Sequence, residues 1–301
     1  MKKLVLIFGG MGFVGTHIAQ LLSSDYSVYS FGSDTDVRDF NVIKNTIEKY
    51  TPYWVINCAS ITTVKESFRN ENTTYNIGFL GTLNILKALK SISFSGSFLN
   101  ISSSEVYGHP SISEMPIYES SALRPMSPYS VSKLASESLC YYWSQTEKFK
   151  IVTARSFTHI GPGQSDRFSI SNFSKQIAEI VLKMRDPILY VGDLSTTRDF
   201  TDVRDVVRAY RMLLENGNNG NVYNVCSGVE TSLKNILDRL ISKTGVNIKV
   251  EIDEKFIRSS EQKRLLGSYD KLLNETGWTP TIDLDKTVDD MLDYWLQQLR
   301  Q

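Results

Sequence analysis

A tyrosine and a lysine stand four residues apart in the stretch SPYSVSKLASE, which begins at Ser127. Ser127 is a favourable N-cap and Pro128 suits the first helical position, so we expect a helix from here to about Lys148. On that helix Tyr129 and Lys133 lie on one face, one turn apart. A phenol beside a cation can donate or accept a proton in catalysis. An isolated pair at this spacing also occurs by chance on solvated helix faces, so other motifs must decide.

A glycine triplet near the start of the chain predicts nucleotide binding. In GGMGFVG, Gly9, Gly12 and Gly15 lie three residues apart, after the apolar run LVLIF and before an amphipathic stretch. Glycines in a strand-turn-helix let the backbone approach a pyrophosphate, and the helix N-terminus supplies N–H groups. We therefore expect a cofactor site that includes these glycines with Phe13 and Val14. A plain tight turn is the alternative.

The end of the second expected strand bears on which dinucleotide binds. An acidic residue at this position usually contacts the adenosine ribose, but here the strand ends in YSFGSD, with Gly32 in that place. The missing acid removes an obstacle to a 2′-phosphate, so NADPH is favoured over NADH, with Ser33 as a contact. Asp36 and Val37 are placed to meet the adenine, although Asp36 can equally be a solvated loop acid.

A third motif, SSSEVYG, begins at Ser102 and ends the apolar stretch SFLNIS. A hydroxyl at the end of this strand would face the same crevice as the helix that carries Tyr129 and Lys133. Three serines can also simply cap a turn.

The elements that must position these motifs alternate along the first half of the chain. Apolar runs typical of buried strands are separated by helical patterns; the expected strands are 4–8, 26–31, 53–59, 97–102 and 151–157, and the expected helices 13–22, 40–50, 74–90 and 128–148. This alternation predicts an α/β fold with βαβ crossovers and a doubly wound parallel Rossmann sheet. Ligands of such a sheet bind at the carboxyl ends of its strands.

The pattern changes after Phe157 and predicts a smaller C-terminal α/β lobe that binds the substrate. THIGPGQSDRF is loop-like, and shorter elements follow; we expect helices at 172–184, 202–215, 232–242 and 283–299 and strands at 188–191 and 222–227. Part of this segment is expected to return to the main sheet. The expected division is residues 1–157 plus about 199–226 for the NAD(P)-binding domain, and about 158–198 plus 227–301 for the other.

Composition narrows the class of protein. Lys plus Arg and Asp plus Glu number 33 each, and this zero formal charge argues against a general nucleic-acid or membrane-surface role. Cys58, Cys140 and Cys226 lie far apart in apolar contexts, so we expect reduced thiols and no metal site. No signal peptide or membrane-length run is visible, and a cytoplasmic location is expected.

In this order and spacing, the three motifs resemble the extended short-chain dehydrogenase/reductase family. The resemblance covers nearly the whole chain, including NCAS and NIGFLGTLNIL. It implies that Ala59, Ser60 and Asn76 also belong to the cofactor site.

The resemblance also implies a mechanism. Ser103 would hold the substrate oxygen and Tyr129 would transfer a proton, while hydride moves between the cofactor and a carbon of the substrate. Lys133 would anchor the nicotinamide ribose, and its charge together with the positive charge of the nicotinamide would lower the pKa of Tyr129. A non-catalytic dinucleotide-sensing Rossmann protein would be expected to lack one of these three residues, and all three are present.

Later stretches resemble the nucleotide-sugar branch of the family, in particular reductases of GDP-4-keto-6-deoxymannose. They are ARSFTHIGPGQ, VGDLSTTRDFTDVRDVVRAY and VYNVCSG. They imply NAD(P)H-dependent reduction of the C4 keto group of an NDP-4-keto-6-deoxyhexose to an NDP-6-deoxyhexose for polysaccharide biosynthesis. GDP is the favoured nucleotide, and a dTDP-linked substrate stays open. The implied substrate contacts include Ser104, Gln164 and Thr158, and Thr158 stands where many relatives carry Asn. Arg198 and Arg258 are implied to bind the phosphates of the nucleotide sugar; surface salt bridges are the alternative for both arginines.

Glu105 keeps two other reactions open. In 4,6-dehydratases of this family a glutamate just before a Val-Tyr-Gly or Leu-Tyr-Gly segment acts on the C5 proton, and SSEVYG resembles that pattern. The mannose-type reductases look similar here, so Glu105 is a candidate catalytic residue of either class. The remaining motifs favour a reductase over a dehydratase or a 4-epimerase. The family also implies a homodimer built on the helices at 74–90 and 128–148.

Overall fold

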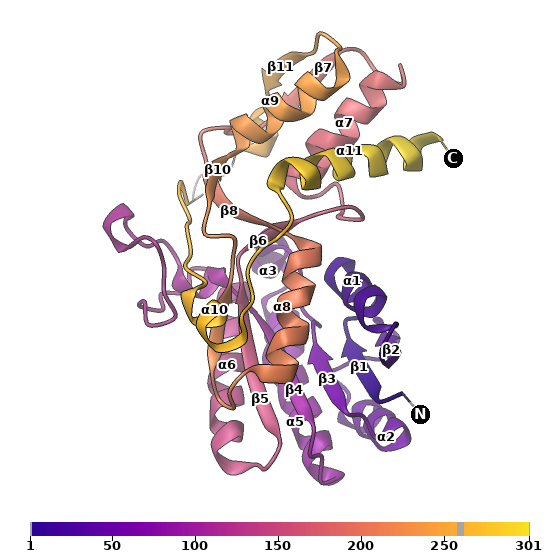
Figure 1. The fold of residues 1–301 in the computed structure, drawn as a ribbon, viewed down its shortest axis with the longest axis vertical. Coiled ribbons are helices and arrows are strands. Elements are labelled where there is room, and N and C mark those ends of the chain that lie inside the picture. Colours follow the sequence, from indigo (N-terminus) through magenta and orange to yellow (C-terminus); the bar gives the residue numbers. More distant parts are fainter. Residues whose placement is uncertain (1, 258–261, 301) are drawn as a thin grey trace.

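The computed structural model describes residues 2–257 and 262–300, which form two lobes (Figure 1). Within these residues, the larger lobe contains a six-stranded parallel sheet in the order β2-β1-β3-β4-β5-β9. Its strands are β1 (Leu4–Phe8), β2 (Ser27–Phe31), β3 (Trp54–Asn57), β4 (Ser97–Ser103), β5 (Lys150–Ser156) and β9 (Val222–Val225). The expected doubly wound parallel α/β fold is confirmed.

Helices cover both faces of this sheet, which explains why its central strands are apolar on both sides. In β1, Val5 and Ile7 pack on α1 (Phe13–Leu22) and α8 (Val203–Asn216), whereas Leu6 and Phe8 pack on the opposite side. That side is covered by α2 (Phe40–Tyr50), α5 (Gly81–Ser91) and α6 (Pro128–Thr146). The alternating side chains of one strand thus enter two separate cores.

The helix expected at 74–90 is not a single regular helix. It consists of α4 (Glu71–Tyr75), a π-helical turn η1 (Asn76–Leu80) and α5, and a short helix α3 (Val64–Arg69) precedes it. A π-helical turn changes which side chains face the sheet from that point on. No helix within the described residues is long and apolar enough to cross a membrane.

The smaller lobe has its own core. Among the described residues it contains the sheets β10-β8-β6 and β11-β7 and the helices packed on them; the elements are β6 (Thr158–Ile160), β7 (Ile188–Val191), β8 (Thr197–Asp202), β10 (Glu230–Ser232), β11 (Lys249–Ile252), α7 (Ser169–Val181), α9 (Leu233–Thr244) and α11 (Leu284–Arg300). Part of the stretch expected to be loop-like is strand β6, and α7 begins three residues before its expected start. A short helix α10 (Asp270–Thr276) packs beside β9. β9 and α8 lie with the main sheet but β8 does not, and the two-domain division stays a prediction.

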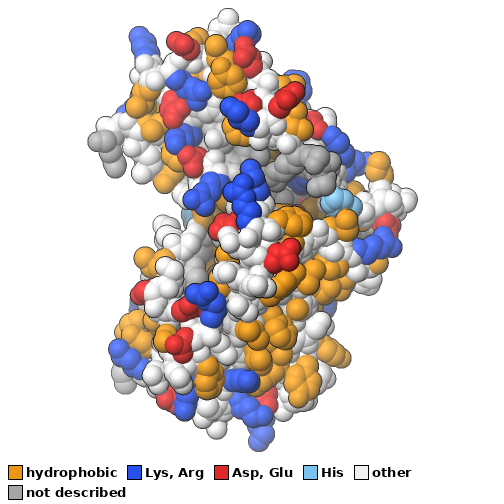
Figure 2. All heavy atoms as spheres, turned by 180° about the vertical axis from the view of Figure 1, so that it is seen from behind, with side chains coloured by type: hydrophobic (Ala, Val, Ile, Leu, Met, Phe, Trp, Pro, Cys, Tyr) orange, Lys and Arg blue, Asp and Glu red, His pale blue; other side chains and the backbone are white. Residues whose placement is uncertain are grey.

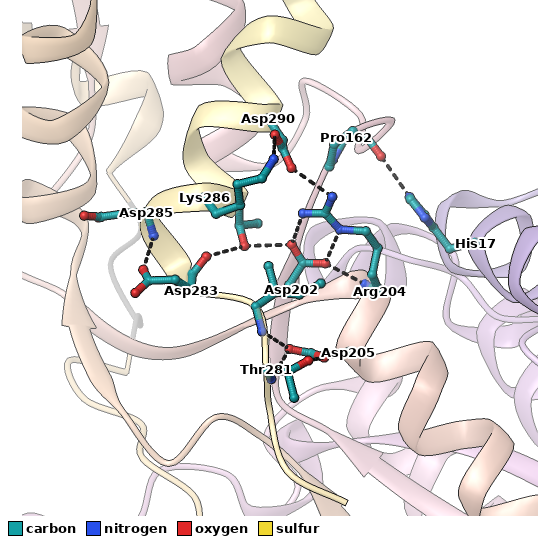
Figure 3. Close-up of polar contacts among 12 residues, drawn as sticks. His17, Pro162, Asp202, Arg204, Asp205, Thr281, Asp283, Asp285, Lys286 and Asp290 are labelled. Atoms are coloured by element: carbon teal, nitrogen blue, oxygen red, sulfur yellow. Dashed lines mark hydrogen bonds and ion pairs between the residues drawn. The ribbon is translucent and has the colours of Figure 1, made fainter.

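A buried carboxylate joins the two lobes (Figure 3). Asp202 ends β8 and caps α8: it accepts hydrogen bonds from the Arg204 backbone N–H at 2.7 Å and from the Arg204 guanidinium at 2.9 and 2.6 Å. Thr287 of α11 donates to the same carboxylate at 2.7 Å, and Arg204 also pairs with Asp290 of α11 at 2.8 Å. These contacts hold β8 and α11 against the start of α8, which packs on the Rossmann sheet.

Candidate active site

One cavity of about 770 Å³ opens at the carboxyl ends of β1, β3, β4 and β5. It brings together nearly all residues expected to do chemistry or bind ligands; those on its wall are Ser103, Glu105, Tyr129, Lys133, Gly9, Gly12, Phe13, Val14, Gly15, Ser33, Asp36, Val37, Ala59, Ser60, Ser104, Thr158, Gln164 and Arg198. Their roles stay predictions, but their convergence from both lobes on one crevice is what a shared site requires.

Two expected residues do not join this wall. Asn76 is exposed at the start of η1, and the neighbouring Ile77 lines the cavity. The contact of Asn76 with the cofactor stays a prediction. Arg258 lies outside the described residues.

The β1–α1 turn has the geometry of a dinucleotide site. Gly9 has a φ of +73°, and a Cβ placed there would be 2.7 Å from the backbone nitrogen of Ala59. A Cβ on Gly15 would be 2.5 Å from the Cα of Gly10, so α1 can approach the turn only because Gly15 has no side chain. Gly12 is the N-cap of α1 and supplies no side chain to its first N–H groups. These groups and the helix dipole suit a diphosphate, so the residues present fit NAD(P).

The three residues of the expected catalytic set meet where β4 ends. Ser103 is the last residue of β4; its Oγ accepts a hydrogen bond from the Glu105 backbone N–H at 3.2 Å, and its side chain also hydrogen-bonds to that of Tyr129. Lys133 is buried, and its Nζ donates to the carbonyl oxygen of Ile101, two residues earlier in β4, at 2.7 Å. The Lys133 ammonium lies 5.7 Å from the centroid of the Tyr129 ring.

Burial dominates the electrostatics of this set. It raises the pKa of Tyr129 to about 12; the hydrogen bond with Ser103 opposes this rise and the Glu105 carboxylate adds to it. Burial also lowers the pKa of Lys133 to about 8, against the opposing effects of Cys58 and Glu137. Lys133 itself donates to the carbonyl oxygen of Ile101, and the lowering of the pKa of Tyr129 by Lys133 and the nicotinamide charge together stays a prediction. The chain by itself holds Tyr129 as a protonated phenol, the form that can donate a proton.

The structure adds two features that the motifs did not assign. Arg38, from the stretch DVRD, lines the cavity beside Ser33 and donates to Asp36 through its Nη2 at 2.6 Å, a contact that lowers the pKa of Asp36. The N-terminus of α7 also faces the cavity through Ser169, and its N-cap, Phe168, has no side-chain cap hydrogen bond. The DVRD arginine was visible in the sequence, but nothing local showed that it would face the cofactor groove.

Polar groups of the smaller lobe complete the wall. Arg198 of β8 donates to the Thr197 carbonyl at 2.8 Å. Gln164 is buried; its Nε2 donates to the His159 carbonyl at 3.0 Å, and its Oε1 has no hydrogen-bond partner among the described residues. Together with the uncapped N-terminus of α7, this wall offers anion-binding groups and one unused acceptor. In residues 2–257 and 262–300 no group of three or more His, Cys, Asp and Glu side chains could hold a metal ion.

The chain is similar in sequence to a known protein family along most of its length. The family model described as GDP-mannose 4,6 dehydratase matches residues 30–291. The chain belongs to this family. A curated relative in it, the GDP-6-deoxy-D-mannose reductase of Pseudomonas aeruginosa, is 38% identical over 303 residues, covering 100% of both chains. The membership confirms the expected extended short-chain dehydrogenase/reductase resemblance and its nucleotide-sugar branch.

Solved structures agree with the family assignment. The structure of RMD from Pseudomonas aeruginosa complexed with NADPH has a TM-score of 0.92 and 38% identity, covering 99% of this chain and 100% of that chain. The UDP-glucose 4-epimerase of Thermus thermophilus, solved in complex with NAD, has a TM-score of 0.84 and 25% identity, with coverage of 97% and 98%. The fold of the family thus spans both lobes of this chain.

Proposed function

We propose that this protein uses NADPH to reduce the C4 keto group of a GDP-linked 4-keto-6-deoxyhexose to the corresponding GDP-6-deoxyhexose. The observation that carries the proposal is that Ser103, Tyr129 and Lys133 meet in the cavity that also contains the glycine turn and Arg198. Full-length similarity to the GDP-6-deoxy-D-mannose reductase of Pseudomonas aeruginosa supports this choice of substrate class.

The chain's own residues carry the proton side of the reaction. Ser103 and the Tyr129 hydroxyl hydrogen-bond to the carbonyl oxygen of the substrate, and Tyr129 gives that oxygen its proton as negative charge develops there. The neighbouring Lys133 ammonium stabilises the resulting tyrosinate, which regains a proton from solvent. NADPH supplies the hydride that adds to C4. A phenol held protonated by burial is suited to start this sequence.

The preference for NADPH is supported by the residues at the end of β2. Gly32 stands where an acid would repel a 2′-phosphate, while Ser33 and Arg38 line the same part of the cavity. A guanidinium and a hydroxyl are suitable donors to a phosphate. The NADPH complex of RMD from Pseudomonas aeruginosa points the same way, and NADH remains the alternative.

Residues of the smaller lobe are assigned to the nucleotide sugar. Arg198 and the N-terminus of α7 bind its diphosphate, because both offer positive charge and N–H donors at one wall of the cavity. Gln164 Oε1 accepts a hydrogen bond from a sugar hydroxyl, and Ser104 and Thr158 contact the sugar. A dTDP-linked sugar would present the same diphosphate and hexose, so the test includes it.

Glu105 favours one further candidate, a 4,6-dehydratase. The residue lies on the cavity wall, close enough for its carboxylate to raise the pKa of Tyr129. A dehydratase would use this carboxylate on the C5 proton, whereas a C4 reductase has no step at C5. A Glu105→Gln variant that keeps the wild-type reduction rate supports the reductase; loss of a dehydration activity in that variant supports the dehydratase.

The proposal includes a homodimer. Exposed apolar side chains on η1 and α6 support it; they are Leu80, Val131, Tyr141 and Tyr142, and both tyrosines are 60% exposed. Figure 2 shows apolar side chains gathered over the lower lobe. A contiguous apolar surface of this kind favours an interface in which η1, α5 and α6 pair with the same helices of a second copy. A cytosolic location is also proposed, in keeping with the unpaired thiols of Cys58, Cys140 and Cys226.

The deciding experiment mixes the purified protein with NADPH or NADH and, separately, the GDP- and dTDP-linked 4-keto-6-deoxy sugars. Loss of reduced-cofactor absorbance with one of them, and NMR of the product, would identify the base and the C4 configuration. Conversion of a parent NDP-hexose or its 4-epimer without net cofactor use, and no oxidation with any keto sugar, would refute the reductase and favour a dehydratase or epimerase.

A further inference from the structure

A buried ion pair lies directly behind the catalytic set. Glu137 of α6 and Arg155 of β5 are each only 5% exposed, and Arg155 Nη2 donates to Glu137 Oε2 at 2.7 Å. Arg155 Nε adds hydrogen bonds at 3.0 and 3.1 Å to the two carboxylate oxygens. Removing two charges from water costs several kcal/mol, and a buried pair is tolerated when its geometry is good and its remaining groups are satisfied.

The remaining groups of the pair are satisfied by the strand and turn that carry Ser103. Ser102 Oγ donates to Glu137 Oε1 in a short hydrogen bond. Arg155 Nη1 donates to the Tyr107 hydroxyl at 2.9 Å and to the Glu119 carbonyl at 3.1 Å. The Tyr107 hydroxyl in turn donates to an amide oxygen of β9 at 2.6 Å. The pair is therefore the centre of a closed polar network that connects α6, β4, β5 and β9.

This network connects the two elements on which catalysis depends. Glu137 follows Lys133 by four residues on α6, so the two side chains lie on one face. Ser102 stands between Ile101, whose carbonyl accepts the Lys133 hydrogen bond, and Ser103. Ser102 is also the direct register partner of Arg155 in the β4–β5 pairing. A displacement of the pair would therefore change the position of Ser103 relative to Lys133.

The network also sets the charge around Lys133. Burial lowers the pKa of Lys133, while Glu137 on α6 and Cys58 at the end of β3 raise it. Tyr129 of α6 presents its ring to the ammonium at 5.7 Å, and Arg155 is the cation held on the far side of Glu137. Among these groups, Glu137 is the carboxylate that favours the charged form of Lys133.

We propose that Glu137 and Arg155 are positioning residues of the reduction, which hold Ser103 in register with Lys133 and keep the Lys133 ammonium charged beside Tyr129. This inference rests on the proposed function. Neither residue lines the cavity, and the pair acts through Ser102 and Lys133. A pair that only stabilised the fold would affect the melting temperature and leave the pH dependence of turnover unchanged.

The test compares four variants with the wild-type protein, using the keto sugar that the wild type reduces. Glu137→Gln leaves a buried Arg155 charge without its partner, which destabilises the fold. The double variant Glu137→Leu/Arg155→Met is therefore measured beside it. It replaces both charges by apolar side chains and is expected to fold. Glu137→Asp keeps the charge with a shorter reach. Glu179→Gln, which breaks a partly buried pair with Arg185 far from the cavity, is the matched control.

The expected result is a change in turnover that stability does not explain. In the folded double variant, kcat falls at least about tenfold with little change in the KM for the sugar, as expected when catalytic groups are misaligned by a fraction of an ångström. In Glu137→Gln, which keeps the Arg155 cation, the alkaline limb of kcat/KM moves to lower pH, because Lys133 loses the nearby carboxylate. Glu137→Asp restores the alkaline limb but not the full kcat, and Glu179→Gln changes neither.

A folded double variant with wild-type kcat would overturn the inference, as would a wild-type pH profile in Glu137→Gln or a change confined to the melting temperature. If the wild-type protein reduces none of the keto sugars, the proposed function fails, and the inference is then tested by fluorescence titration of NADPH against pH. Since Lys133 is expected to bind the nicotinamide ribose, Glu137→Gln should lose NADPH affinity at lower pH than the wild type. Equal pH dependence would refute the positioning role independently.

Discussion

Two alanine substitutions in the glycine turn should have different effects. In Gly15→Ala the new Cβ would lie 2.5 Å from the Cα of Gly10 and 2.7 Å from its carbonyl carbon and oxygen. Ordinary carbon contacts are about 3.5–4.0 Å, so α1 and the turn must separate by about 1 Å. In Gly12→Ala the nearest atom is the Gly9 carbonyl oxygen, at 3.3 Å, so the fold can accept the methyl group with a small adjustment. The Gly12 methyl would instead occupy the N-terminus of α1, where the diphosphate is expected.

The magnitudes follow from these distances. Forcing a methyl group into a packed backbone contact costs about 2 kcal/mol, so Gly15→Ala should lower Tm by roughly 5 °C. Gly12→Ala should lower Tm by less than half of that and weaken NADPH binding at least about tenfold, which corresponds to about 1.4 kcal/mol. Differential scanning fluorimetry gives the first quantity and NADPH fluorescence titration the second. Wild-type NADPH affinity in Gly12→Ala would refute the placement of the diphosphate at this turn, and an unchanged Tm in Gly15→Ala would refute the close approach of α1.

Four further outcomes are expected. Tyr129→Phe should lower kcat by about 10²–10⁴-fold while NADPH affinity stays near the wild-type value, because only the proton donor is removed. In the wild type, kcat/KM should fall as the pH rises through about 8, where Lys133 loses its proton. A flat pH profile of the wild type would contradict this. Arg38→Ala should raise the KM for NADPH and leave that for NADH unchanged, measured by initial rates; equal changes would show that Arg38 does not contact the 2′-phosphate. Tyr141→Glu combined with Tyr142→Glu should convert a dimer to a monomer in light scattering after size exclusion, and a dimer that persists would rule out this face of α6.

The Rossmann half of the fold could be predicted because its signals are local and periodic. The helices at 13–22 and 40–50 have the bounds that their apolar spacing indicates, and the buried runs became strands of one parallel sheet. Each of these elements is long enough for its own periodicity to identify it. The twofold alternation in β1 also follows directly from a sheet covered on both faces.

The smaller lobe could be predicted less well, because its short strands depend on partners distant in sequence. Strand β10 is three residues long and pairs with β8, where Thr231 stands opposite Arg198. Strand β6 begins the stretch THIGPGQ, whose glycines and proline indicate a loop. A three-residue strand has no periodicity of its own, so only the tertiary contact identifies it.

Residues of the site could likewise be predicted only where their signal lies within one segment of the sequence. Motifs that lie within one segment, such as the glycine turn and the pair Tyr129 and Lys133, could be recognised and lie on one cavity. Asn76 lies outside the cavity wall although its motif predicts a cofactor contact, and no propensity signals the π-helical turn in which it lies. The rise of the Tyr129 pKa by burial could not be predicted from the motif, because desolvation depends on everything that surrounds the phenol, which is a property of the folded chain.

The connection between the lobes separates the residues predicted for catalysis from those predicted to bind the nucleotide sugar. Strand β5 ends at Ser156 and β6 begins at Thr158, so the substrate wall continues directly from the sheet that positions the catalytic residues. The residues predicted for catalysis lie on β4 and α6, which are packed in the Rossmann core, whereas Arg198 and the N-terminus of α7 belong to elements of the other lobe. The Asp202 junction and the hydrogen bond from His17 to the Pro162 carbonyl at 2.9 Å hold that lobe against α8 and α1 (Figure 3). Substitutions in the smaller lobe can therefore alter which nucleotide sugar binds without displacing Ser103, Tyr129 or Lys133, because the contacts that position those three residues lie within the Rossmann domain.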